Sequence, residues 1–501
     1  MGAMQNGDYQ RDLLNRLRHG PVHMTGIKGT GMAALAEILH SRSITITGSD
    51  GPETYFTDEL LQRLGIVPRI GFSPDHIPPE TQVLVYSAAY AESNEERREA
   101  MRRSIPTLSY FEALGLLAHG RTTLAVVGVH GKTSTTAMIG TMLAQDDPSA
   151  PDPRVAVTVV AGSAVPTFGG RATMCQGDAL FVVEACEYRR HFLHFTPTVM
   201  LVTGVEWDHQ DYYTEEADIH AAFLELAQQI TPGGTLVYCA DDPGACRLAA
   251  AISPMRRDIT VEAYGFSATG EGRISAYATG EGVQYAAFGT DSARWELSVP
   301  GRHMVQNAAG AVTALTHLLP DSVDRDAWRR RITAYRGTRR RGEIVGEAAG
   351  ILVLDDYAHH PTAIRATLQG FASFYPERRL VVDFMSHTYS RTEALLYEFA
   401  QAFDVADEVV FNGIYPSARE EPPAEDVAER LYRAIQEHHP HVLYEADFSR
   451  AATYLCQRLQ SGDIFITMGA GDNFRIGQMV LATLQKTAPQ VSPSPKGASS
   501  A

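Results

Sequence analysis

The sequence has few cysteines and no apolar run of the length that a membrane-spanning helix requires. Its five cysteines are scattered, odd in number and without a C-x-x-C pair; they are Cys175, Cys186, Cys239, Cys246 and Cys456. This usage gives no zinc motif and is typical of a reducing compartment. The amino terminus also lacks the hydrophobic region of a signal peptide. We therefore expect a cytoplasmic protein without membrane insertion.

The chain also lacks an excess of basic residues. Lys and Arg total 43 against 59 Asp and Glu, which gives a net charge of −16 at pH 7. Nucleic-acid phosphates would repel such a chain, so we expect no nucleic-acid partner. A local basic pocket for a small anionic substrate remains compatible with this charge.

A glycine turn that suits phosphate lies within residues 124–136, LAVVGVHGKTSTT. The apolar start predicts a buried parallel strand, and a helix is expected from Thr133. Backbone N–H groups and the positive end of that helix would face a phosphate, Lys132 would contact it, and the Thr133 hydroxyl would bind Mg²⁺. The strict Walker pattern requires glycine where Val126 stands, so the motif is the shorter G-x-x-G-K-T. The alternative is an ordinary strand-to-helix turn that contains a lysine.

Residues 21–50 predict a first strand–turn–helix–strand unit of a Rossmann-like domain, ending at Asp50. The spacing is G-x-x-G-x-G, not the G-x-G-x-x-G of dinucleotide binders; the glycines are Gly26, Gly29 and Gly31. From this loop alone, NAD, another nucleotide and a plain tight turn all stay open. A further strand ends at Ser87, whose hydroxyl could meet a ligand or cap a helix.

Acidic residues follow two apolar strands predicted at 178–184 and 198–203. Ligands collect at the carboxyl ends of parallel strands, so we expect the following residues near Lys132: Glu184, Glu187, Glu206, Asp208 and His209. Carboxylates suit Mg²⁺, whereas His209 is an unusual ligand for it and could equally be a structural histidine.

The last third of the chain again alternates strands and helices, with strands predicted at 350–356, 380–384 and 463–467. The arginine run at 339–341 is either a solvated patch or a clamp for a γ-phosphate. The predicted fold class is α/β with three domains: a Rossmann-like domain over 1–119, a central P-loop-type ATPase domain with a parallel sheet over 120–340, and a Rossmann-like domain over 341–487. The Pro- and Ser-rich tail, 488–501, is expected to be disordered.

Eight motifs, in order along the chain, resemble those of the Mur ligases: GIKGTGM, GVHGKTSTT, VVEACE, VEWDH, PGRH with a following Asn, the arginine run, DDYAHHP and SHTYSRT. The resemblance runs from His23 to about Asp472. It implies an ATP-dependent, ADP-forming carboxylate–amine ligase of peptidoglycan precursor synthesis. Within the family it is closest to the members that join L-alanine to UDP-N-acetylmuramate. There, the sugar carboxylate attacks the γ-phosphorus of ATP, and the amine of L-alanine then displaces phosphate from the acyl phosphate.

The resemblance also implies roles for individual residues. The catalytic set would be Lys132, His209, Arg341, His387 and Arg391. The ATP site would comprise Gly128, His130, Gly131, Lys132, Thr133, Ser134, Asn307, Arg341 and Asp356. The UDP-sugar site would comprise Gly26, Gly29, Gly31, Asp50 and Ser87. The Mg²⁺ ligands would be Thr133, Glu184 and His209, and a monomer or weak homodimer is expected.

The chain departs from the family pattern at several positions. The family usually has Thr at Val129, Asp at Cys186 and Asn at Met304. These changes affect nucleotide and amino-acid selectivity, so three alternatives stay open. They are a recycling ligase that adds a tripeptide to the same sugar, a catalytically silent nucleotide-binding homologue, and an NAD-dependent dehydrogenase. The glycine spacing and the second phosphate loop count against the last.

Overall fold

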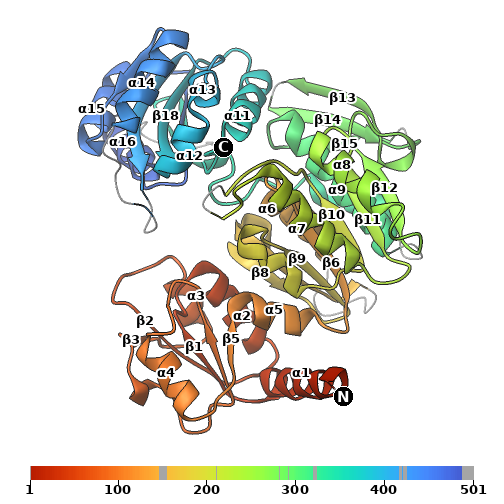
Figure 1. The fold of residues 1–501 in the computed structure, drawn as a ribbon. Helices are drawn as coiled ribbons and strands as arrows, with labels where there is room; N and C mark the ends of the chain where they lie inside the picture. Colours follow the sequence, from red (N-terminus) through yellow and green to blue (C-terminus); the bar gives the residue numbers. More distant parts are fainter. Residues whose placement is uncertain are drawn as a thin grey trace, which may run out of the picture. The chain divides into compact units, whose positions relative to one another are not determined.

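The computed structural model describes residues 2–145, 155–209, 212–280, 282–291, 293–319, 324–416, 420 and 426–487. The chain divides into two compact units, Met1–Arg339 and Arg340–Ala501. Figure 1 shows both units as α/β structures, and each is described by itself below. The tail predicted to be disordered, 488–501, lies outside the described residues.

The first domain of unit 1 is a five-stranded sheet in the order β3-β2-β1-β4-β5, with every pair parallel. Its strands are β1 (Val22–Thr25), β2 (Ile46–Asp50), β3 (Arg69–Ile70), β4 (Val83–Tyr86) and β5 (Thr107–Ser109). Its helices are α1 (Gly2–His19), α2 (Thr30–His40), α3 (Asp58–Arg63), η1 (Pro74–His76), α4 (Glu95–Arg102) and α5 (Tyr110–Ala118). The strand order reverses between β1 and β4, so the glycine turn after β1 lies at a topological switch point, where open parallel sheets bind ligands.

Burial explains why these segments adopt their structures. All four residues of β1 are buried, as expected for a central parallel strand. Helix α2 buries every residue from Met32 to Leu39, because it packs between its own sheet and the central domain. Ser109 and Glu112 form a capping box that starts α5 directly after β5.

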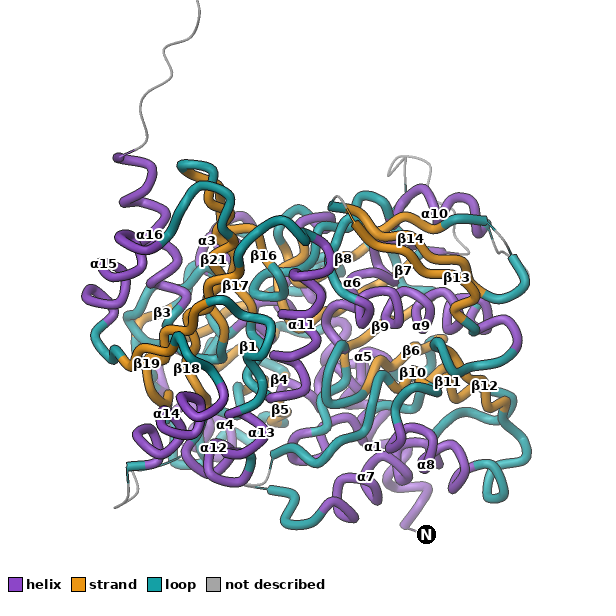
Figure 2. The backbone as a smooth tube through the Cα atoms, turned by 90° about the horizontal axis from the view of Figure 1, so that it is seen from above, coloured by secondary structure: helices purple, strands orange, loops and turns teal. Residues whose placement is uncertain are grey.

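The central domain of unit 1 has a seven-stranded sheet in the order β12-β11-β10-β6-β9-β7-β8, in which β8 is antiparallel to β7 and the other pairs are parallel. Its strands are β6 (Thr122–Val127), β7 (Val157–Val165), β8 (Arg171–Cys175), β9 (Leu180–Glu184), β10 (Val199–Val202), β11 (Thr235–Cys239) and β12 (Thr260–Tyr264). Its helices are α6 (Lys132–Leu143), η3 (Pro166–Phe168), η4 (Tyr188–His194), α7 (Glu216–Gln228), α8 (Pro243–Ile252), η5 (Gly270–Gly272), α9 (Arg302–Leu318) and α10 (Arg325–Ile332). Helices α6 and α9 lie side by side against this sheet (Figure 2).

A separate three-stranded antiparallel sheet follows β12. It consists of β13 (Ile274–Gly280), β14 (Val283–Phe288) and β15 (Trp295–Leu297). Phe288 and Trp295 are buried and belong to the hydrophobic core that surrounds α9.

The first and central domains share a continuous hydrophobic core, which is why they form one compact unit. Polar contacts support this interface. The Glu37 carboxylate on α2 accepts hydrogen bonds from the Thr173 hydroxyl and from Arg171 Nη1, the latter at 2.7 Å.

Unit 2 has a six-stranded sheet in the order β16-β17-β21-β18-β19-β20, with β16 antiparallel to β17 and the other pairs parallel. Its strands are β16 (Glu343–Ala348), β17 (Ile351–Asp356), β18 (Leu380–His387), β19 (Glu408–Tyr415), β20 (Val442–Tyr444) and β21 (Ile464–Met468). Its helices are α11 (Pro361–Phe374), α12 (Tyr389–Ala394), α13 (Leu396–Ala400), α14 (Val427–His438), α15 (Phe448–Arg458) and α16 (Phe474–Thr487). Helix α11 begins at Pro361, a residue favoured in the first helical turn, with His360 as its N-cap. Across the described part of the chain, the helices are either too short or too polar to span a membrane.

Candidate active site

The phosphate loop joins β6 to α6 and carries two glycines in backbone conformations that other residues rarely adopt. Gly128 has φ 131° and Gly131 has φ 80°. A Cβ on Gly128 would lie 2.2 Å from Thr203 Oγ1, and one on Gly131 would lie 2.7 Å from Asn307 Oδ1. The glycines therefore let the loop pass close to β10 and α9 while its N–H groups begin α6, an arrangement that suits an anion.

Lys132, the first residue of α6, turns back onto the loop. Its Nζ lies 2.8 Å from Glu187 Oε2 and 2.5 Å from the Gly128 carbonyl oxygen. Burial by itself would lower the pKa of Lys132, but the charges of Glu187 and Glu184 raise it above its ordinary value. The lysine is therefore a charged group held at the carboxyl end of the central sheet.

Thr133 and Glu184 form an oxygen-rich pair beside this lysine. Thr133 Oγ1 donates to Glu184 Oε1 at 3.0 Å, while the Gly162 N–H donates to Glu184 Oε2 at 2.6 Å. Strand β9 pairs with β6 on one side and with β7 on the other, which brings Thr133, Glu184 and Gly162 together. A hydroxyl next to a carboxylate is a donor set that Mg²⁺ prefers, so these residues fit the predicted metal.

His209 lies on the other side of Glu187. Its Nε2 is 3.3 Å from Glu187 Oε1, and its side chain is 21% exposed, so it is not a core residue. The backbone there has φ 57°, and the His209 N–H donates to Asp208 Oδ1 at 2.7 Å. Burial would raise the pKa of Glu187, but Lys132 and His209 outweigh it and lower that pKa. Glu187 therefore stays ionised between a lysine and a histidine.

The other ATP-site residues of unit 1 surround the same loop. His130 Nε2 lies 3.4 Å from Glu206 Oε2, and the His130 carbonyl accepts a hydrogen bond from the Thr203 hydroxyl. Ser134 is buried in the first turn of α6, and Asn307 is buried on α9. Met304, where the family usually has Asn, places its sulfur 3.9 Å from Asn307 Nδ2.

The predicted UDP-sugar residues also meet at one place. Gly26 follows β1 with φ 83°, and a Cβ there would lie 2.9 Å from Ser87 Cβ at the end of β4. A Cβ on Gly31 would come within 2.8 Å of the Tyr110 ring. Gly29 is the N-cap of α2, so the N–H groups of that helix are directed at this edge of the first sheet.

Asp50 braces the first glycine loop from inside. Its carboxylate accepts the Lys28 N–H at 2.6 Å, the Gly51 N–H at 2.8 Å and the Tyr90 hydroxyl at 2.9 Å. Only 5% of Asp50 is exposed, so its role in this structure is to hold the loop. Lys28 itself donates to two backbone carbonyls, Gly51 at 3.0 Å and Glu53 at 2.9 Å.

A cavity of about 290 Å³ lies beside the start of α2, where the first domain faces the β7–β8 turn. Its lining includes one acid, Glu59, and three arginines, together with Thr30 and Phe56; the arginines are Arg63, Arg171 and Arg339. The Arg339 guanidinium stacks over the Phe56 ring at 4.6 Å. The cavity thus offers positive charge and an aromatic surface next to the glycine loop.

In unit 2, Asp356 ends β17 and is buried. Its carboxylate accepts the Gly342 N–H at 2.7 Å and the Ala358 N–H at 2.8 Å. Burial raises the pKa of Asp356 to about 6, although the neighbouring Arg341 charge and these N–H groups act in the opposite direction. The Arg341 guanidinium lies 5.1 Å from the Tyr357 ring. The structure therefore brings Arg341 and Asp356 together.

His387 and Arg391 form a second pair in unit 2. Arg391 Nη1 lies 3.1 Å from His387 Nδ1. Between them, Thr388 has φ 64°, an unfavourable conformation for a β-branched residue. The Thr388 carbonyl accepts the Thr392 hydroxyl at 2.6 Å, and Thr392 also contacts Ser386 at 2.7 Å. These hydroxyl contacts hold the strained turn that positions the pair.

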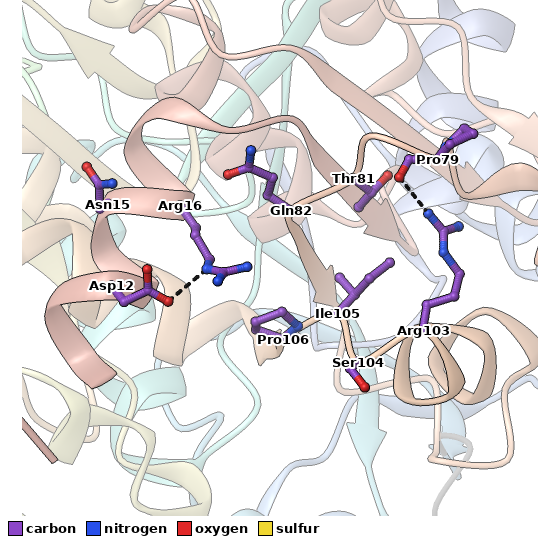
Figure 3. A pocket seen from close by; sticks show the side chains of 10 residues that line it. All are labelled: Asp12, Asn15, Arg16, Pro79, Thr81, Gln82, Arg103, Ser104, Ile105 and Pro106. Atoms are coloured by element: carbon purple, nitrogen blue, oxygen red, sulfur yellow. Dashed lines mark hydrogen bonds and ion pairs between the residues drawn. The ribbon is translucent and has the colours of Figure 1, made fainter. Parts of the chain in front are cut away.

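A second, larger opening of about 460 Å³ lies at the amino ends of β4 and β5 (Figure 3). It is on the opposite edge of the first sheet from the glycine loop, because the strands are parallel. Its two arginines are already engaged: Arg16 Nε donates to Asp12 Oδ2 at 2.8 Å, and Arg103 donates to the carbonyls of Ile77, Pro78 and Pro79. This opening is not part of the candidate site.

The structure places several groups in the candidate site that were not among the predicted site residues. Glu187 was expected near Lys132 but not as its ion-pair partner. Gly162, Thr203 and Tyr90 lie in segments without a distinctive motif, and only their spatial neighbours reveal their contacts. The available signal was Glu187 of VVEACE, which stands three residues beyond Glu184, just after strand β9.

Comparisons with known proteins agree with this geometry. Three domain families match: "Mur ligase family, catalytic domain" over residues 21–122, "Mur ligase middle domain" over 126–315, and "Mur ligase, glutamate ligase domain" over 340–471. A UDP-N-acetylmuramate–L-alanine ligase of Treponema pallidum is 42% identical over 466 residues, covering 92% of this chain and 95% of the relative. A ligase of the same name from Desulfitobacterium hafniense is 40% identical, covering 92% of this chain and 99% of the relative.

The fold is shared with a crystal structure of UDP-N-acetylmuramate–alanine ligase from Thermotoga maritima. The TM-score is 0.75 at 23% identity, and the match covers 93% of this chain and 100% of the other. This likeness supports the three-domain α/β arrangement. Because the family matches span most of the sequence in order, and because relatives above 30% identity align along nearly their full length, the chain belongs to the Mur ligase family.

Proposed function

We propose that this protein joins L-alanine to UDP-N-acetylmuramate at the expense of ATP, in the synthesis of peptidoglycan precursors. The observation that carries the proposal is the set of groups at the carboxyl end of the central sheet. Lys132, Thr133, Glu184, Glu187 and His209 lie together there, linked by contacts of 2.8 to 3.3 Å. The matched family regions, residues 21–122 and 126–315, span both glycine loops.

The reaction brings anions together, so its main requirement is positioning and charge neutralisation. The sugar carboxylate attacks the γ-phosphorus of ATP, and ADP leaves. The amine of L-alanine then attacks the acyl carbon, the bond to phosphate breaks, and the amine loses a proton. Lys132 and the N–H groups of the loop would stabilise negative charge on the phosphates in the first step.

We assign the Mg²⁺ positions to Thr133 and Glu184 and, for a second ion, to His209. Bound there, Mg²⁺ would neutralise charge on the phosphoryl oxygens. Glu184 is oriented for this by the Gly162 N–H, and Glu187 keeps His209 and Lys132 in place. The oxygen ligands of Thr133 and Glu184 fit Mg²⁺ well, and a ring nitrogen of His209 would be the ligand of the second ion.

The nucleotide sugar is assigned to the first domain. The N–H groups at the start of α2 suit its diphosphate, and the neighbouring cavity supplies Arg63, Arg171 and the Phe56 ring. In unit 2, Asp356 and Arg341 are assigned to ATP, and His387 and Arg391 to the amino substrate and the acyl phosphate.

A phosphate-release assay with UDP-N-acetylmuramate, ATP and Mg²⁺ tests the proposal. L-Alanine should give the highest kcat/KM in a panel that includes other amino acids and a murein tripeptide. Preference for the tripeptide would identify a recycling ligase instead. If the protein binds ATP but releases phosphate with none of these amino substrates, it is a catalytically silent homologue.

A further inference from the structure

Two arginines contact a single carboxylate where the first domain meets the central domain, and a third arginine, Arg18, lies close to them. Arg42 follows α2, and its Nη2 lies 2.7 Å from Asp178 Oδ1. Arg121 precedes β6, and its Nη2 lies 3.0 Å from Asp178 Oδ2. Arg18 on α1 donates from Nη2 to the His119 carbonyl at 3.2 Å. The cluster is outside the ligase machinery described above.

The charges of this cluster do not balance. Asp178 contributes one negative charge against three positive ones, in a protein whose net charge is −16. Burial and then the Arg42 charge lower the pKa of Arg18, and the same two causes lower the pKa of Arg121 to about 10. The surroundings therefore disfavour three guanidinium charges with only Asp178 to offset them.

Two donors of the cluster are also unused. Arg42 Nη1 and Arg18 Nε are buried and have no hydrogen-bond partner within the described ranges. The side chains of Arg42 and Arg121 are only 12% and 11% exposed, so desolvation has a cost that these donors do not recover. Asp178 is 48% exposed, which places one side of the cluster at the solvent.

We propose that Arg18, Arg42 and Arg121 form a binding site for a small oxyanion of the phosphate class. Guanidinium groups bind such anions through charge-assisted hydrogen bonds, and an anion on the solvent side of the cluster, beside Asp178, would supply the missing negative charge. The arginines of the opening in Figure 3 differ from this cluster, because they donate to Asp12 and to backbone carbonyls. Because the three arginines and Asp178 come from both domains of unit 1, the bound anion would stiffen their interface.

Thermal unfolding of the full chain in inorganic phosphate tests the site, with chloride at equal ionic strength as the reference. Phosphate should raise Tm of the wild type, and Arg42→Gln should weaken the apparent phosphate affinity about tenfold or more, as expected for one charge-assisted contact. Arg18→Gln should act in the same direction. Because Arg18→Gln removes no contact to Asp178, this variant can test the proposal if Arg42→Gln fails to fold. Arg102→Gln is the matched control, because Arg102 is 73% exposed and pairs only with Glu99 along its own helix.

Phosphate can also bind the loop at Lys132, so the same titration is made on Lys132→Ala. That variant should keep a phosphate response, and the response should be lost when Arg42→Gln is added. Titration with ADP distinguishes free phosphate from a nucleotide phosphate, since ADP binding should be unaffected by Arg42→Gln. Equal phosphate responses in the wild type, Arg42→Gln and Arg18→Gln would overturn the proposal, as would a response that Lys132→Ala alone removes.

Discussion

The two glycine loops of unit 1 have the same connection of strand, turn and helix but use their charged residues differently. In the first, Lys28 is 5% exposed; its Nζ donates to two backbone carbonyls and lies 3.8 Å from Asp58 Oδ1, while the Asp50 carboxylate accepts the Lys28 N–H. In the second, Lys132 meets a carboxylate, Glu187, and the next hydroxyl meets Glu184. The first loop is thus braced by its own charges, and the second keeps its charges at the place where phosphate chemistry is proposed.

This difference indicates what each loop can contribute. The braced loop presents neutral backbone N–H groups in a fixed shape, which suits recognition of a substrate that does not react at that point. The second loop has a cation, a hydroxyl and carboxylates that can exchange partners, which suits a site where negative charge develops. Substitutions in the first loop should therefore alter binding or stability, and those in the second should alter the chemical step.

Replacing Lys132 or Lys28 by alanine should give the largest kinetic difference between the two loops. Lys132→Ala should lower kcat at least about 100-fold, since a preorganised charge contact of this kind contributes about 3 kcal/mol to transition-state stabilisation. Lys28→Ala should instead raise KM for the nucleotide sugar and lower stability, with kcat changed less than about threefold. Phosphate-release kinetics measure both. Similar losses of kcat in the two variants would remove the distinction between the loops.

The metal dependence should give the next largest effect. Glu184→Gln keeps the shape but removes the charge, and it should raise the Mg²⁺ concentration for half-maximal activity about 10-fold to 100-fold. His209→Ala should raise it as well, with Tm nearly unchanged because the side chain is partly exposed. Titration of activity with Mg²⁺ gives these values. A large loss of Tm in His209→Ala with an unaltered Mg²⁺ requirement would show that His209 is structural.

Sequence reasoning located both loops and the residues at their strand ends, because glycine turns after apolar strands have a local signature. It could not show what each loop does with its lysine. Lys28 stands two residues after Gly26, and Lys132 stands four residues after Gly128. Lys28 donates to the carbonyls of residues 51 and 53, whereas Lys132 donates to the Gly128 carbonyl and to Glu187. Such partners depend on tertiary packing. For the same reason, the sequence does not show that Asp50, a residue predicted for the UDP-sugar site, accepts from three donors of its own domain.

Glycine-to-alanine substitutions should show how strongly the backbone of each loop is constrained. Gly131→Ala would place a Cβ 2.7 Å from Asn307 Oδ1 at φ 80°, so we expect a loss of about 1–2 kcal/mol in the free energy of unfolding. Gly29→Ala is the matched variant, because φ is −57° and the nearest atom to its Cβ would be 3.5 Å away. It should change stability by less than about 1 kcal/mol. Denaturant unfolding of both variants compares them, and equal losses would show that the phosphate loop is not constrained by α9.

The smallest effects on stability and kinetics should come from removing one tyrosine hydroxyl beside each loop. Tyr90 donates to Asp50 at 2.9 Å, and Tyr213 donates to the Glu187 carbonyl at 2.6 Å. Each Tyr→Phe change deletes one hydrogen bond at constant ring volume, so each should cost about 1 kcal/mol of stability. Their kinetic effects should differ, since Asp50 shapes the loop assigned to the sugar and Glu187 holds Lys132 and His209. Tyr90→Phe should raise KM for the nucleotide sugar at unchanged kcat, whereas Tyr213→Phe should lower kcat at nearly unchanged KM. If Tyr90→Phe lowered kcat as much as Tyr213→Phe, bracing by Asp50 would serve the chemical step as well, and the two loops would not be separate in function.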